Sequence, residues 1–226
     1  MTTSQQTALR DSPDKAGNTM FDQYNWQKVT GAQLEPFLKL INPIQAKHNA
    51  SAATATAEWC QLPFYNSIGL VRVNDTAWAP NTGPFWFLAK QGRMFLLDGS
   101  SAPIHDANEA DPIKVTEQNT LEYLRFFCYF VHGDEGPFLI VEGLDHAALD
   151  QTKLDPNTKK VIEGAIRPAT FEGRTAEGAY EASAMVLYGN ALFSARFSMT
   201  ENGMIEMIDD EPVAADLPVK KIKPNY

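Results

Sequence analysis

Residues 115–143 read VTEQNTLEYLRFFCYFVHGDEGPFLIVEG, a helical pattern that runs into a glycine-bearing turn and a short apolar segment. At 100° per residue, one set of apolar side chains falls on one side of the helix: Leu121, Leu124, Phe127, Cys128 and Val131. Tyr123, Phe126 and Phe130 widen that side to more than half of the circumference. A helix this apolar is normally covered by protein, so we expect a central helix at about 117–132.

The ends of this helix also have expected positions. Thr116 is the expected N-cap, with Glu117 at the positive end of the helix dipole. Gly133 is the expected left-handed C-cap. Residues 138–141 are apolar on both alternating faces, which predicts a covered inner strand after the turn.

A narrow polar stripe remains on the helix, with members spaced four, three, four and three residues apart. It consists of Gln118, Glu122, Arg125, Tyr129 and His132. An ordinary amphipathic helix turns such a stripe to water. The alternative is that the stripe lines a pocket, in which case Glu122, Arg125, Tyr129 and His132 are the candidate binding residues.

The composition limits the classes of protein. The chain has 226 residues, 44% of them apolar, and a net charge of −9. This length allows one large domain or two small ones, and the apolar content supports a substantial core. Because no domain boundary is apparent, we expect a single domain over 21–226. The negative charge argues against nucleic-acid binding and against adhesion to an anionic membrane, because both need a basic field.

The first 20 residues and the cysteines bear on location. Residues 1–20 are polar and lack the apolar core of a secretory signal, so we expect a flexible leader. No apolar run approaches the length of a membrane span. Cys60 and Cys128 form no close-spaced metal or redox pair. We therefore expect a cytoplasmic protein.

Two helices and a hairpin are predicted in the first half. A helix should begin at Thr30, with Gln33 completing a capping box. Its inward side chains should be Leu34, Phe37, Leu38 and Ile41. Asn42 followed by proline predicts a second helix towards Trp59. Further strands are predicted at 67–73, 85–90 and 93–98, and residues 99–115 are predicted to form a long acidic loop.

The last third is predicted to be all strand from 161 onwards, after a turn at 155–157. Gly189-Asn190 should join strands 180–188 and 191–199, because this register puts ten mostly apolar residues on one face. Asn202-Gly203 should form a second two-residue loop. Arg196 then lies opposite Asp209, with Glu181 on the diagonal.

These elements predict an α+β fold. We expect a mainly antiparallel, curved sheet with a C-terminal β-meander, covered on one face by helices that include the central one. The space between sheet and helix is a usual place for a ligand.

No catalytic motif is present, and the nearest cluster of chemically active residues is scattered. It contains His105, His132 and His146 near the carboxylates of Asp106, Asp134, Glu135, Glu142 and Asp145. Histidine and carboxylate are zinc ligands, but their spacing matches no standard signature. We therefore favour a non-catalytic module that binds a small molecule or self-associates into a homo-oligomer. The alternative is a metal-assisted hydrolase that uses the three histidines, and no other cofactor is implied.

Overall fold

The computed structural model describes residues 21, 23–45, 48–79, 82 and 84–220. The predicted leader at 1–20 lies outside them. Within these residues two larger antiparallel sheets form. The first runs in sequence order through β1 (Gln27–Val29), β2 (Ala55–Gln61), β3 (Gly69–Asp75), β4 (Phe85–Lys90) and β5 (Arg93–Leu96).

The second sheet contains the C-terminal meander. Its strands are β8 (Leu139–Ile140), β9 (Thr170–Arg174), β10 (Tyr180–Tyr188), β11 (Ala191–Met199) and β12 (Ile205–Ala214). Both β8 and β9 pair with β10, and β12 forms the opposite edge. A small separate pair joins β6 (His132–Gly133) to β7 (Gly136–Pro137). The α+β class, the antiparallel pairing and the meander are thus confirmed, with the strands divided between two sheets.

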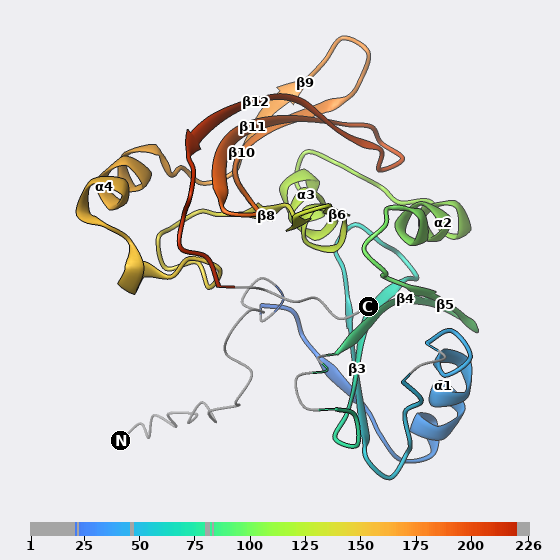
Figure 1. Ribbon diagram of the computed structural model, residues 1–226. Helices are drawn as coiled ribbons and strands as arrows, with labels where there is room; N and C mark the ends of the chain where they lie inside the picture. The colour runs from blue at the N-terminus through green and yellow to red at the C-terminus, as the bar shows by residue number, and fades with distance from the viewer. Residues whose placement is uncertain (1–20, 22, 46–47, 80–81, 83, 221–226) are drawn as a thin grey trace, which may run out of the picture.

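The helices form the layers around the sheets. They are α1 (Leu34–Ile41), α2 (Ala102–Ala110), α3 (Thr120–Phe130) and α4 (Pro156–Ala165), with short 3-10 turns at η1 (Gly31–Gln33) and η2 (Gln151–Lys153). Figure 1 shows α2 and α3 between the two sheets, with α1 on the far side of the first sheet. The largest apolar cluster accordingly draws on α3 and on both sheets.

The helix that was predicted after Asn42 is wrong. Asn42 is the C-cap of α1. Its side chain bonds to the backbone of Ala50, donating to Ala50 O (2.9 Å) and accepting from Ala50 N (2.8 Å). The later part of the segment is β2, in which Ala55 and Ala57 are buried and Thr56 is exposed. Alanine and threonine are weak local signals, so pairing with β1 and β3 decides the conformation.

Two further helices replace a predicted loop and a predicted strand. The acidic loop at 99–115 contains α2, which buries Ile104, Ala107 and Asn108 at helical spacing. The Asp-Pro pair at 155–156, which was interpreted as a turn, begins α4. Asp155 caps that helix by accepting from Asn157 N (3.0 Å) and Thr158 N (3.1 Å). The statement that the last third is all strand is therefore wrong.

The central helix is shorter at both ends than predicted. Asn119 takes the N-cap position in place of Thr116, whose carbonyl instead accepts from Thr120 N (3.0 Å). At the other end the helix ends at Phe130, with Val131 as an extended C-cap, and Gly133 belongs to β6. Gly133 lies so close to the Tyr188 hydroxyl that a Cβ would collide with it. Glycine is needed there for space and not for a left-handed cap.

The strand that was predicted at 138–141 is present but is not an inner strand. β8 covers two residues and, within the described residues, lies at the edge of the second sheet beside β10. Leu139 and Val141 are buried.

The C-terminal hairpin is confirmed in full. Gly189 and Asn190 join β10 to β11, and the register runs from Tyr188 opposite Ala191 to Tyr180 opposite Met199. The second loop differs: Met199 lies opposite Ile205, so the loop is Glu201-Asn202-Gly203. Gly203 has the positive φ (83°) that is typical of three-residue hairpin loops.

Arg196 nevertheless lies opposite Asp209, as predicted. Phe197 pairs with Met207, and the register then shifts by one residue, so that Ile208 is the extra residue of a β-bulge. The bulge compensates for the longer loop. Arg196 forms its ion pair with Glu181 on the neighbouring strand, at 3.2 Å.

Candidate functional site

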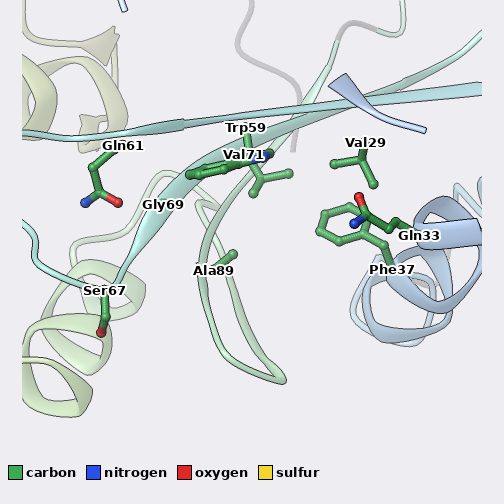
Figure 2. Close-up of a pocket in the computed structure, with 9 residues that line it drawn as sticks. All are labelled: Val29, Gln33, Phe37, Trp59, Gln61, Ser67, Gly69, Val71 and Ala89. Atoms are coloured by element: carbon green, nitrogen blue, oxygen red, sulfur yellow. The ribbon is translucent and has the colours of Figure 1, made fainter. Parts of the chain in front are cut away.

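A groove lies between α1 and the part of the first sheet that α1 leaves uncovered. Its volume is about 430 Å³. Figure 2 shows the lining residues: Val29, Gln33, Phe37, Trp59, Gln61, Ser67, Gly69, Val71 and Ala89.

Strand alternation builds the floor of this groove. Trp59 lies opposite Val71, Gln61 lies opposite Gly69, and Gly69 lies opposite Ala89, so all five residues share one face of the sheet. The eight residues of α1 span about 12 Å, whereas the seven residues of β3 span about 23 Å. The helix is therefore too short to cover the whole face, and the uncovered part becomes the floor.

Gly69 allows the Trp59 indole to lie across the sheet. A Cβ at Gly69 would come within 3.2 Å of Trp59 Cε3 and 3.2 Å of Cys60 O. Both distances are shorter than ordinary van der Waals contacts, so a larger residue would push the indole away. The missing side chain thus makes a flat apolar floor.

Two amide side chains mark opposite ends of the groove. Gln33 approaches from the start of α1, beside Phe37, and Gln61 lies beyond Trp59 at the other end (Figure 2). None of the described residues that line the groove is charged. The site is therefore apolar in its middle and neutral but polar at its ends.

Ser67 is hydrogen-bonded to the carboxylate of Asp111, whose negative charge is balanced by Lys90. Asp111 Oδ2 accepts from Ser67 N (3.0 Å) and Ser67 Oγ (2.8 Å), and its Oδ1 lies 3.2 Å from Lys90 Nζ. Burial raises the pKa of Asp111, but the bonds from Ser67 and Lys90 outweigh it and hold that pKa below its usual range. Asp111 is therefore an ionised structural carboxylate and a weak base.

The predicted polar stripe lies elsewhere, on α3. Arg125 Nη2 donates to Glu142 Oε1 (2.6 Å), and the same oxygen accepts from Ala169 N (2.9 Å). Burial raises the pKa of Glu142, yet the bonds from Arg125 and Ala169 hold it below its ordinary value. This pair connects α3 to the segments that lead from β8 and into β9.

Three of the other four stripe residues, Glu122, Tyr129 and His132, are half-buried, whereas Gln118 precedes α3 and is exposed. Burial raises the pKa of Tyr129 to about 12, and its ring packs edge-on against Phe21 at 5.2 Å. Burial also lowers the pKa of His132, whose Nε2 lies 3.2 Å from Tyr129 O. Glu122 is half-buried on the same helix. Apart from Gln118, the stripe is therefore partly covered by protein, and none of its four candidate binding residues lines the groove.

The three candidate metal-binding histidines belong to separate elements. His105 lies on α2 with its ring 6.0 Å from that of Phe127, and His132 follows α3. His146 lies in the turn after β8, where its Nδ1 accepts from Ala148 N (3.3 Å). In the part of the chain that the structure describes, no group of three or more His, Cys, Asp or Glu side chains could hold a metal ion.

The sequence predictions missed the groove because Trp59 was assigned to the end of a helix. One signal was present: Gly69 lies within the strand that was predicted at 67–73, between Ile68 and Leu70. A glycine inside a strand often marks a close approach by another group.

No helix within the described residues is long and apolar enough to cross a membrane. The chain matches no protein-family model, no curated protein and no solved structure. The functional interpretation of the groove therefore rests on the residues of this chain alone.

Proposed function

We propose that this chain is a non-catalytic binding protein that holds a small uncharged molecule in the groove between α1 and the first sheet. One observation carries the proposal: the Trp59 indole lies on the floor of a preformed hollow of about 430 Å³, with an amide at each end. Pockets for small molecules are commonly hollows of this size, mostly apolar and with a few well-placed polar groups.

The chemistry of the lining supports binding without catalysis. General acid–base catalysis needs a titratable group in reach of the ligand, and none of the described lining residues is charged. Ser67 is the lining residue that most resembles a nucleophile. Its hydroxyl proton is directed at Asp111, whose lowered pKa makes it a poor base.

A melting-temperature screen with uncharged ring compounds tests this function. Ligands that bind only the folded chain raise the melting temperature by mass action. Ala89→Leu adds a side chain on the floor of the groove and should abolish the shifts. Leu40→Ala, at an exposed position on α1 outside the lining, should leave them unchanged. Hits that stabilise Ala89→Leu as much as the natural chain would refute a ligand site in the groove.

Self-association is a second candidate function, and β12 supports it. This edge strand is ten residues long, and its neighbourhood exposes Met204, Met207 and Ile208. Exposed edges of this kind pair with other strands. Glu206, Asp209, Asp210 and Glu211 on the same strand oppose pairing between identical copies, so association should strengthen with salt. Sedimentation and native mass spectrometry at low and high salt test it, and a strict monomer at both would exclude it.

We also propose a cytoplasmic location, supported by two buried cysteines that form no disulfide. Burial raises the pKa of both Cys60 and Cys128 to about 12, which makes them unreactive thiols. The alternative of a metal-assisted hydrolase has no supporting group of ligands within the described residues.

A further inference from the structure

The Gln61 amide has a fixed orientation. Its Nε2 lies 3.2 Å from Leu62 O, 2.7 Å from Tyr65 O and 3.0 Å from Ile68 O. An amide nitrogen carries two hydrogens, and these carbonyls use both of them. Turning the amide over would place Oε1 against the same three oxygens, which repel it. The nitrogen must therefore face the turn at 62–68.

This constraint makes Gln61 Oε1 a dedicated acceptor in the groove. The oxygen lies on the side of the amide that is nearer Trp59 and Gly69 (Figure 2). No described residue donates a hydrogen bond to it. Because the nitrogen is engaged and the oxygen is not, this end of the groove offers an acceptor to a ligand and no amide donor.

The lining also decides which charge the ligand carries. An anion would be repelled by the Gln61 acceptor oxygen, and the net charge of −9 on the chain adds to that repulsion. A cation would lose hydration without gaining a carboxylate, because Asp111 is paired with Lys90 and Ser67. A neutral N–H or O–H group avoids both costs. Gln33, which is exposed, can turn to donate or to accept at the other end.

We infer that the groove binds an uncharged ring compound that stacks on Trp59 and donates a hydrogen bond to Gln61 Oε1. This inference rests on the proposed function and adds the ligand's class and orientation. The flat floor over Gly69 suits a planar ring, since offset stacking on an aromatic face is favourable.

Indole and benzofuran form a matched pair of probes for the complete chain. The two have nearly the same shape, but indole carries an N–H donor where benzofuran carries an acceptor oxygen. Each is titrated while the Trp59 indole N–H signal is followed by ¹H–¹⁵N NMR, with the signal assigned from Trp59→Phe. Both should shift it, and indole should bind roughly two- to tenfold tighter because of the extra hydrogen bond.

Variants separate the role of Gln61 from a general loss of structure. Gln61→Met keeps the length of the side chain without the acceptor and should reduce indole affinity to that of benzofuran. Gln91→Met, in the exposed turn between β4 and β5, should leave the ratio unchanged. The comparison on the natural chain does not depend on how well Gln61→Met folds.

The outcomes distinguish the inference from the function on which it rests. If both probes shift the Trp59 signal and bind with equal affinity, the inferred hydrogen bond from the ligand to Gln61 Oε1 is overturned, and the groove remains a binding site. If benzofuran binds tighter, the orientation of Gln61 is wrong. If neither probe shifts Trp59 at saturating concentration, the inference and the proposed function both fall.

Discussion

At the scale of single residues, the aromatic side chains of α3 differ in burial, and the apolar side predicted for this helix did not indicate which of them are most buried. Tyr123, Phe126 and Phe130 are at most 2% exposed, whereas Phe127, which was predicted on the apolar side of the helix, is half-buried against His105. The helix lies between two sheets, so its most buried side is set by tertiary packing. Periodicity predicted a covered helix but not which residues face the core.

Replacing Phe126 by alanine should therefore destabilise the fold more than replacing Phe127. Phe126→Ala should cost about 3–5 kcal/mol, because its ring packs against Phe64 and Phe130 in the core. Phe127→Ala should cost about 1 kcal/mol, the ordinary value for a partly exposed site. Urea unfolding of both variants measures the difference, and a larger cost for Phe127→Ala would contradict this packing.

Two histidines should make stability depend on pH. Burial lowers the pKa of His132 and of His146 below the ordinary 6.5, although Asp145 and Glu142 oppose the shift at His146. Between the folded and unfolded pKa values the unfolded chain binds more protons. The contribution of the two histidines to the free energy of unfolding should therefore be fully present above pH 6.5 and should be lost as the pH falls below it.

Urea midpoints at a series of pH values check this dependence. His146→Gln should flatten part of the decline below pH 6.5, because glutamine does not titrate. Stability that stays constant from about pH 7 to about pH 5 would show that the histidines titrate alike in both states.

The Gln61 site was beyond sequence reasoning for a different reason. Its orientation depends on three carbonyls of residues 62, 65 and 68, and these converge only after the turn has formed. Arg196 was more predictable, since its neighbours follow from strand register.

At the scale of elements, local turn chemistry decided what could be predicted. Gly189-Asn190 fixes the β10–β11 register, because the apolar pattern allows no slip. The β11–β12 connection reached the predicted pairing by another route, in which a three-residue loop is offset by the bulge at Ile208. Bulges leave little trace in a short sequence window.

Deleting Ile208 should therefore be tolerated. Without the extra residue, Asp209 follows Met207 directly and still lies opposite Arg196, so no other side chain changes face. The free energy of unfolding should change by less than about 1 kcal/mol, since Ile208 is exposed. Chemical denaturation measures it.

Deleting Ser194 is the matched control in the inner strand β11. That deletion turns the following side chains to the opposite face of a strand that is paired on both sides. It should cost at least about 3 kcal/mol, the scale of losing a large core side chain. Equal losses for the two deletions would mean that Ile208 is part of a regular ladder.

At the scale of the whole molecule, the two sheets share one apolar cluster through α2 and α3. A buried polar chain crosses the same layer. Tyr65 Oη donates to Asn108 Oδ1 (2.6 Å), Asn108 Nδ2 donates to Tyr123 Oη (3.3 Å), and Tyr123 Oη donates to Gly203 O (2.7 Å). The sequence predicted the C-terminal meander, β4, β5 and one central helix, but it missed β2, and the division of the strands into two sheets depends on contacts between distant segments.

The shared core predicts that residues 21–220 unfold as one unit. All four tryptophans lie between residues 26 and 86, so their fluorescence reports the first sheet. Hydrogen exchange of β10 amides reports the second sheet. The two probes should give the same urea midpoint, as in two-state unfolding. Separate midpoints would mean two independent domains and would refute the single domain that we expect.

Ligand binding over Trp59 is most directly tested by a crystal structure of the chain soaked with a mixture of uncharged, cationic and anionic ring fragments. We expect density for an uncharged ring on the Trp59 indole, between Gln61 and the start of α1, with a donor atom about 2.9 Å from Gln61 Oε1. Fragments that occupy another surface while the groove stays empty, or a charged fragment over Trp59, would contradict the proposed binding site.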